Sequence, residues 1–205
     1  MKALLLIDIQ NDFLPGGSLA VPNGDEIIPL VNRVHEKFDL VVATQDWHPQ
    51  SHKSFASNHE GRQVFEQIEL YGLPQVLWPD HCVQGTAGAE LSPAVRWHQT
   101  EAIFRKGTNP EIDSYSGFYD NGHLKATGLG AYLKGRGVTT VYIAGLAADF
   151  CVYFTAKDAL AEGFATFLIE DATRAISSDG FEKAKKELLE RGGHLVLSHD
   201  IPPVQ

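Results

Sequence analysis

Short, almost uninterrupted apolar runs alternate along the chain with segments whose apolar residues recur at helical spacing. Runs that are apolar at nearly every position are typical of strands buried on both faces, as in a parallel sheet covered by helices. These runs predict strands at 3–7, 39–44, 101–106, 138–145, 164–171 and 194–198, and helical spacing predicts helices at 24–38, 123–137, 151–163 and 177–193. The alternation indicates an α/β fold: a three-layer sandwich with a central, mostly parallel six-stranded sheet and helices on both faces.

The segment at about 45–100 departs from this pattern, because it is rich in His, Pro, Trp and Gln and has little periodicity. A long irregular insertion in a compact domain is usually functional or disordered, and the aromatic residues favour order here. No repeat, low-complexity tract or linker interrupts the rest of the chain. The sequence therefore predicts a single domain, 1–205, whose insertion carries metal-binding and substrate-binding residues.

The charge and hydropathy of the chain exclude several classes of partner. Its 205 residues carry a net charge of −9, which argues against binding to nucleic acid or to an anionic membrane surface. No run approaches the roughly 18 apolar residues of a membrane span. The first apolar run is too short for a signal peptide and is interrupted by Asp8. We therefore expect a cytoplasmic protein whose two cysteines, Cys82 and Cys151, are reduced thiols.

Chemically capable side chains follow four of the predicted strands. Asp8 follows the first strand, Asp46 and His48 the second, Lys106 ends the third and Cys151 follows the fourth. Ligands of open parallel sheets bind beyond the carboxyl ends of the strands, which meet at one edge. The sequence therefore predicts a functional site that gathers these side chains at that edge.

Cys151 begins a predicted helix, where the positive end of the helix dipole favours a thiolate. Asp8 follows a buried strand, so its pKa should rise, and it could accept the proton of the thiol. Lys106 could supply positive charge, whereas strand alternation sends Arg105 to the opposite face. Cys82 lies in an irregular segment without a clear helix start and is the weaker candidate nucleophile.

The insertion also contains candidate metal ligands. Asp46 and His48 are two residues apart, so an extended backbone places both side chains on one side. His81 could complete a set of one carboxylate and two imidazoles, which suits Zn²⁺, with Fe²⁺ or Mn²⁺ as alternatives. His52 and His59 are further candidates in the same segment. The alternative is a merely polar loop, since this spacing also occurs by chance.

Five segments, read in order, match a known family: ALLLIDIQNDF, ATQDWHPQSHKSFAS, WPDHCVQGT, FRKGTNPEIDSYSGFYDN and VYIAGLAADFCVYFTAKDA. Over nearly its whole length the chain resembles the nicotinamidases, within the isochorismatase-like cysteine hydrolases. The resemblance implies hydrolysis of nicotinamide to nicotinate and ammonia through a cysteine thioester, in NAD recycling, with pyrazinamide as a further substrate. It also implies one divalent metal ion, with zinc as the first choice, and leaves a homo-oligomer open.

The resemblance implies a role for each matching residue. Cys151 matches the nucleophile, Asp8 the general acid/base, Lys106 the third catalytic residue, and Asp46, His48 and His81 the metal ligands. A histidine near the position of His52 binds metal in some relatives and not in others, so it stays outside this set.

Further matches concern the substrate pocket. Phe13 and Trp78 match aromatic walls that hold the pyridine ring, and Tyr115 lies in a segment that lines the same pocket. The peptide bond that corresponds to Leu146–Ala147 is often cis in the family. It directs the backbone N–H groups of Ala147 and Cys151 to one point, which forms an oxyanion hole.

Other functions remain as alternatives, first among them a related cysteine hydrolase of the same fold that acts on another amide or a ureide. An isochorismatase needs no thiol, and carbamoyl amidases share the thiol but do not usually carry the metal set. A metal-binding or scaffold protein without chemistry would not need Asp8, Lys106 and Cys151 together. A redox sensor would need Cys82 close to Cys151.

Overall fold

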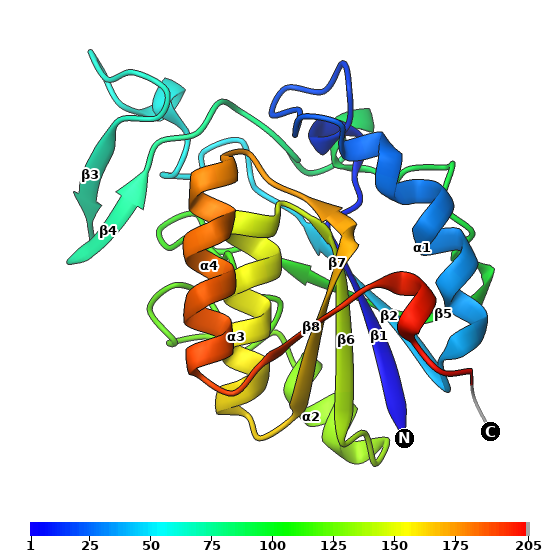
Figure 1. The fold of residues 1–205 in the computed structure, drawn as a ribbon. Coiled ribbons are helices and arrows are strands. Elements are labelled where there is room, and N and C mark those ends of the chain that lie inside the picture. Colours follow the sequence, from blue (N-terminus) through cyan, green and yellow to red (C-terminus); the bar gives the residue numbers. More distant parts are fainter. Residues whose placement is uncertain (204–205) are drawn as a thin grey trace.

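A computed structural model describes residues 1–203 and contains a six-stranded sheet in the order β5-β2-β1-β6-β7-β8 (Figure 1). The strands are β1 (Lys2–Ile7), β2 (Leu40–Asp46), β5 (Thr100–Lys106), β6 (Thr140–Leu146), β7 (Ala165–Arg174) and β8 (His194–Val196). Every neighbouring pair in this sheet is parallel. The predicted six-stranded parallel sheet is therefore confirmed.

Helices cover both faces of the sheet, with α1 (Ile28–Val34) on one side and α3 (Tyr153–Ala161) and α4 (Ser178–Glu190) on the other (Figure 1). Strand β1 is buried on both faces, because Leu4 and Leu6 belong to one apolar cluster while Leu5 and Ile7 belong to the other. Helix α2 (Leu129–Gly135) packs in the same cluster as α3. The near-continuous apolar runs are thus explained by a central sheet between two helical layers.

The segment predicted as one helix at 24–38 is divided into three parts. A 3₁₀ turn at Gly24–Ile27 precedes α1, and a second at His35–Lys37 follows it. Pro29 lies in the first turn of α1, where its missing N–H has no intrahelical partner to lose. The proline therefore fits the start of α1, and the predicted segment is helical, but with 3₁₀ turns at both ends in place of one regular α-helix.

The predicted helix at 123–137 is also shorter, since only α2 is helical there. The Asp120 side chain accepts hydrogen bonds from the backbone N–H groups of Gly122 and Leu124, which stabilises a loop instead. Gly128 then adopts a positive φ of 95° directly before α2. The side-chain bonds of Asp120 replace helical hydrogen bonds over the first part of this segment.

The insertion is ordered and mostly irregular, as expected, but it contains a hairpin that the sequence did not reveal. Strands β3 (Gln67–Leu70) and β4 (Leu73–Val76) pair antiparallel and project from the central sheet (Figure 1). Tyr71 and Gly72 connect them with positive φ at both positions, as a tight hairpin turn requires. Each strand has only four residues, which is too short for a clear alternating pattern.

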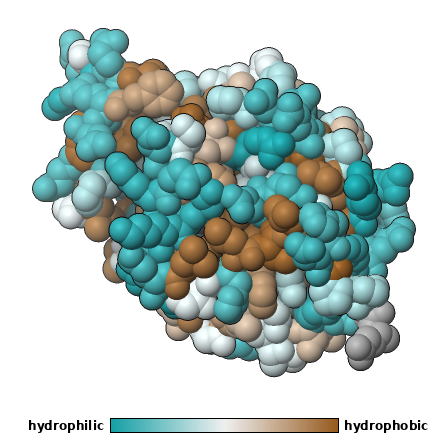
Figure 2. Space-filling view, in the orientation of Figure 1, coloured by the Kyte–Doolittle hydropathy of each residue, from teal (hydrophilic) through white to brown (hydrophobic). Residues whose placement is uncertain are grey.

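The surface mixes polar and apolar side chains, and Figure 2 shows the apolar ones on one face interrupted by hydrophilic residues. Within residues 1–203, none of the helices has the length and apolar character needed to cross a bilayer.

Candidate active site

The side chains predicted at the strand ends do converge. Asp8 directly follows β1, Asp46 and Lys106 end β2 and β5, and Cys151 lies in a π-helical turn, Ala148–Val152, after β6. The Lys106 Nζ atom lies 2.9 Å from Asp8 Oδ2, 2.5 Å from Asp46 Oδ1 and 3.4 Å from Cys151 Sγ. The lysine therefore forms the centre of a buried cluster with two carboxylates and one thiol.

Lys106 and its neighbour Arg105 point to opposite sides of β5, as alternation predicted. Lys106 is 2% exposed, whereas the exposed Arg105 guanidinium lies 3.9 Å above the Trp47 ring. Burial by itself lowers the pKa of Lys106, but the carboxylates of Asp46 and Asp8 raise that pKa well above its usual value. The lysine is consequently a fixed positive charge at neutral pH.

Asp8 is held in one orientation by Thr44. The Thr44 hydroxyl accepts a hydrogen bond from the Asp8 backbone N–H at 3.2 Å and donates one to Asp8 Oδ1 at 2.7 Å. Burial raises the pKa of Asp8, while the positive charge of Lys106 acts in the opposite direction. The expected upward shift of this pKa is therefore present, and it suits a group that accepts and donates a proton near neutral pH.

Cys151 is a buried thiol, and this corrects the expectation that its helix start favours a thiolate. Burial raises the pKa of the Cys151 thiol well above its usual value, with Lys106 opposing and the nearby carboxylates adding to the rise. One oxygen each of Asp8 and Asp46 and the Cys151 sulfur lie within 4.8 Å of one another. Ionisation of this thiol therefore needs a nearby base, for which Asp8 is placed.

Cys82 is the other free thiol, and like Cys151 it is buried. It is fully buried in the apolar cluster on the other face of the sheet from that of Cys151. Burial and several carboxylates raise its pKa well above the usual value. The geometry therefore favours Cys151 as the candidate nucleophile.

Three predicted metal ligands lie together next to this cluster. Asp46 Oδ2 is 3.5 Å from His48 Nε2 and 3.9 Å from His81 Nε2. The Nδ1 atoms of the two imidazoles face the carbonyl oxygens of Gly107 and Pro79, at 2.9 and 2.8 Å. A carbonyl only accepts, so each Nδ1 carries a proton and each Nε2 faces Asp46. This orientation of histidines by outer hydrogen bonds is the one found around protein-bound metals.

The protonation states of the two histidines bear on metal binding. Burial lowers the pKa of His81 to about 4, so this ring is neutral at pH 7, as a metal ligand must be. Burial acts in the same direction on His48, but the Asp46 carboxylate raises its pKa overall. A metal ion at this site would consequently displace a proton from His48. The donor set of one carboxylate and two imidazoles fits a single divalent ion.

Glycine is required at position 107 by the position of His48. A Cβ atom at Gly107 would lie 2.3 Å from Cε1 of the His48 ring, and the backbone there has a φ of +66°. Any larger residue would push the imidazole away from Asp46.

The other two histidines of the insertion have different environments. The ring centre of His52 lies 4.3 Å from that of His48, and its Nδ1 is 2.7 Å from Ser54 Oγ. Its Nε2 is buried and has no hydrogen-bond partner among the described residues. His59 Nε2 instead lies 2.7 Å from the Lys53 carbonyl. His52 is therefore adjacent to the candidate metal ligands, whereas His59 bonds to the backbone instead.

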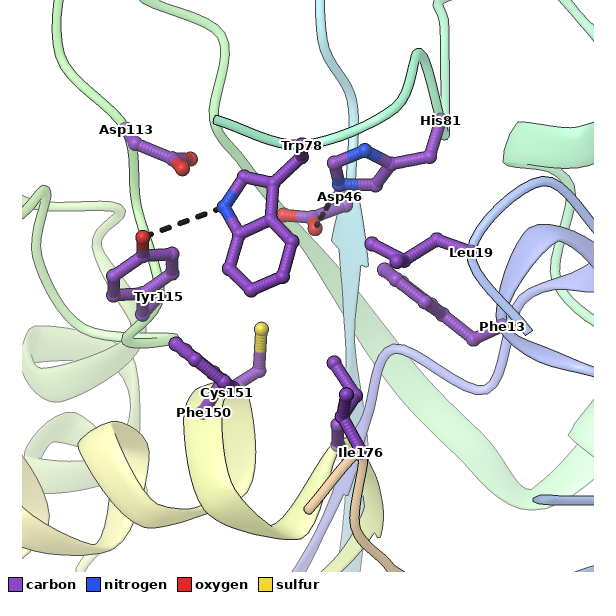
Figure 3. Close-up of a pocket in the computed structure, with 11 residues that line it drawn as sticks. Phe13, Leu19, Asp46, Trp78, His81, Asp113, Tyr115, Phe150, Cys151 and Ile176 are labelled. Carbon is purple, nitrogen blue, oxygen red and sulfur yellow. Dashed lines mark hydrogen bonds and ion pairs between the residues drawn. The ribbon is translucent and has the colours of Figure 1, made fainter. Parts of the chain in front are cut away.

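A cavity opens beside the Cys151 sulfur (Figure 3). Its lining consists of Phe13, Leu19, Asp46, Trp78, His81, Asp113, Tyr115, Ala147, Phe150, Cys151 and Ile176. The predicted pocket residues Phe13, Trp78 and Tyr115 are all among them. The cavity thus joins the candidate nucleophile to the candidate metal ligands Asp46 and His81.

Perpendicular aromatic rings form one wall of this cavity. The Trp78 ring meets Phe150 edge-on, with centroids 4.9 Å apart, and its Nε1 donates a hydrogen bond to the Tyr115 hydroxyl at 3.4 Å (Figure 3). Flat rings fixed in this way leave a slot that suits a flat aromatic ligand.

Four lining residues were missed by the sequence analysis: Leu19, Asp113, Phe150 and Ile176. Phe150 precedes Cys151 in the chain, so its position offered a signal. The other three come from loops, where no periodicity indicates which way a side chain points.

Ala147 and Cys151, the predicted oxyanion-hole residues, both line the cavity. The Leu146–Ala147 peptide bond is cis, as the resemblance implied. The backbone N–H groups of Phe150 and Val152, on either side of Cys151, both donate to the Ala147 carbonyl at 3.1 Å. These bonds hold the turn that carries the sulfur against Ala147.

The chain is similar to known proteins over nearly its whole length. The family model described as "Isochorismatase domain" matches residues 2–200. A nicotinamidase of Acinetobacter baylyi is 50% identical over 200 residues, which cover 97% of this chain and 94% of the relative.

Two solved structures are similar as well. That of an Acinetobacter baumanii nicotinamidase and pyrazinamidase superposes with a TM-score of 0.95 at 48% identity, over 97% of each chain. A Pyrococcus horikoshii pyrazinamidase, solved in complex with zinc, superposes with a TM-score of 0.79 at 40% identity, over 96% of this chain and 98% of that one.

Proposed function

The chain belongs to the isochorismatase family, and from this membership and its site we infer that it is a nicotinamidase. It hydrolyses nicotinamide to nicotinate and ammonia. The observation that carries this conclusion is the position of Cys151, whose sulfur borders both the aromatic slot and the buried Asp8–Lys106 pair. Pyrazinamide, which is also a flat heteroaromatic amide, is the further substrate we expect, in line with the name of the Acinetobacter baumanii protein.

Substrate binding is assigned to the aromatic slot and the neighbouring metal ligands. The ring would lie between Phe13 and Trp78, with Tyr115 at the wall and the carboxamide directed toward Cys151. Asp46, His48 and His81 would hold one divalent ion, for which zinc is the first candidate because the Pyrococcus horikoshii relative was solved with it. When bound, the ion would supply a Lewis-acidic partner for the pyridine nitrogen.

The first half of the reaction forms a thioester. Asp8 accepts the proton of the Cys151 thiol, and the sulfur attacks the amide carbon. The developing oxyanion receives hydrogen bonds from the backbone N–H groups of Ala147 and Cys151, each of which typically contributes about 10²–10³-fold in rate. Asp8 then donates the proton to the departing nitrogen, which leaves as ammonia. Throughout, the Lys106 ammonium balances the negative charge that moves between Asp8 and the sulfur.

The second half hydrolyses the thioester. Asp8 accepts a proton from an attacking water, and the new tetrahedral centre uses the same two backbone donors. Its collapse releases nicotinate, and the sulfur regains a proton. The raised pKa of Asp8 allows one carboxyl group to serve as base and acid in turn at neutral pH.

Ammonia release from nicotinamide, with and without a chelator, tests the function directly. The purified protein should release ammonia, and the chelator should abolish the release because the ring loses a binding partner. Added zinc should restore it. A folded, metal-loaded protein that releases no ammonia would instead indicate another amide or a ureide as the substrate.

His48→Ala should weaken metal binding and substrate binding together. The change removes one of two imidazoles from the ligand set, so bound metal per protein should fall and KM should rise by about tenfold or more. Metal content and steady-state kinetics on the same samples provide the test. His59→Ala, in the same insertion but bonded to the Lys53 carbonyl, is the control and should retain both. Loss of metal with an unchanged KM would contradict a role for the ion in holding the ring.

The cytoplasmic location, the oligomeric state and the place in NAD recycling stay predictions.

A further inference from the structure

Gln75 is a buried amide in a hairpin that is otherwise largely exposed. It is 4% exposed, and it is the only fully buried residue of β4. Burial of an amide is unfavourable unless its hydrogen bonds are made. Packing alone therefore does not explain why this amide is buried on a short, largely exposed hairpin.

The Gln75 side chain reaches the wall of the substrate cavity. Its Nε2 atom lies 2.7 Å from the Val76 carbonyl, 3.0 Å from Asp113 Oδ2 and 3.2 Å from the Tyr115 hydroxyl. The amide has two protons for these three acceptors, so one proton is shared between two of them, and the three bonds together fix the orientation of the amide. Asp113 and Tyr115 both line the cavity (Figure 3). Gln75 thus connects the hairpin to two residues of the pocket without lining it.

The segment that Gln75 contacts also reaches the catalytic lysine. Asp113 Oδ1 accepts a hydrogen bond from the Ser114 backbone N–H at 2.8 Å, and the Ser114 carbonyl accepts one from Lys106 Nζ at 2.8 Å. These two bonds do not involve Gln75, so they would remain without it. Without the amide, Asp113 Oδ2 and the Tyr115 hydroxyl would each lose a hydrogen bond, whereas Lys106 would keep its bond to the Ser114 carbonyl.

We propose that Gln75 is a positioning residue for ring binding, which holds Asp113 and Tyr115, and through the Tyr115 hydroxyl the Trp78 ring, in the orientation that accepts the substrate. This inference rests on the proposed nicotinamidase function. No residue of β3 or β4 lines the cavity. The hairpin would therefore affect substrate affinity indirectly, through Gln75.

Two substitutions of Gln75 test the proposal. Gln75→Met keeps the approximate size and removes the polar group, and Gln75→Glu replaces the donor with a carboxylate beside Asp113. Both should raise KM for nicotinamide about tenfold, the effect of losing one hydrogen bond to a charged group, with kcat changed by less than about threefold. The Kd of nicotinate, measured by calorimetry, should rise by the same factor, because ground-state binding of the ring is lost.

Gln67 provides the matched control, since it is an exposed glutamine on the partner strand of the same hairpin. Gln67→Met and Gln67→Glu should leave KM, kcat and nicotinate Kd unchanged. A folded Gln75 variant with wild-type KM and nicotinate Kd would overturn the proposal. So would a failure of both Gln75 variants to fold beside intact Gln67 variants, because Gln75 would then serve stability alone. A wild-type protein without activity on nicotinamide would instead refute the proposed function.

Discussion

Replacing Cys151 with alanine should abolish nicotinamide hydrolysis, with a fall in kcat on the order of 10⁴-fold or more. The alanine has no sulfur to form the thioester, and no other thiol lines the cavity. The fold should be retained, because the change removes one atom from a turn held by backbone bonds to Ala147. Metal content should also be retained, since the sulfur is not part of the set formed by Asp46, His48 and His81.

Cys82→Ala is the matched control for this experiment. The Cys82 side chain is buried in an apolar cluster and does not line the cavity, so its loss should leave kcat within about threefold of wild type. Mass spectrometry of quenched reactions should find an acyl group on the wild-type and Cys82→Ala proteins and none on Cys151→Ala. Normal turnover by Cys151→Ala would exclude the thioester mechanism.

The strands of the parallel sheet and the meeting of the candidate catalytic groups at one edge could be predicted because both depend on simple periodicity. A parallel sheet brings the ends of its strands to one edge, so Asp8, Asp46, Lys106 and the turn with Cys151 had to meet. Alternation along β5 then required that only one of Lys106 and Arg105 point into the site, and the structure shows that it is Lys106. These features follow from local sequence, which explains why they were correct.

The pocket and the ionisation of the thiol depend on long-range packing and could not be predicted in this way. Asp113, Leu19 and Ile176 come from loops whose conformations are set by contacts elsewhere in the chain. The helix start at Cys151 indicated a thiolate, but the depth of burial, which no local pattern reveals, raises the pKa of the thiol. The resemblance to nicotinamidases supplied the aromatic walls, since spacing alone did not relate Phe13 to Trp78.

Lys106→Met should have the second-largest effect, because it lowers both activity and stability. The lysine side chain is fully buried between Asp8 and Asp46. Without it the two carboxylates lie close together with no cation, and removing one partner of a buried ion pair typically costs about 3–5 kcal/mol. The pKa of Asp8, already raised by burial, should rise further and leave this group protonated near neutral pH. A protonated Asp8 is no base, so kcat should fall by about 10²–10⁴-fold.

The pH dependence of unfolding separates this electrostatic effect from a packing defect. A carboxyl group whose pKa is higher in the folded than in the unfolded chain binds more protons when folded, so stability falls as pH rises from about 4 toward neutrality. Denaturant unfolding of Lys106→Met should therefore show a steeper loss of stability over this window than the wild type does. Arg105→Met removes an exposed cation from the neighbouring position of β5 and should leave the slope and kcat nearly unchanged. If stability changed with pH at the same slope in both variants, Lys106 would not be what holds the carboxylates ionised. Another group would then have to set the protonation of Asp8.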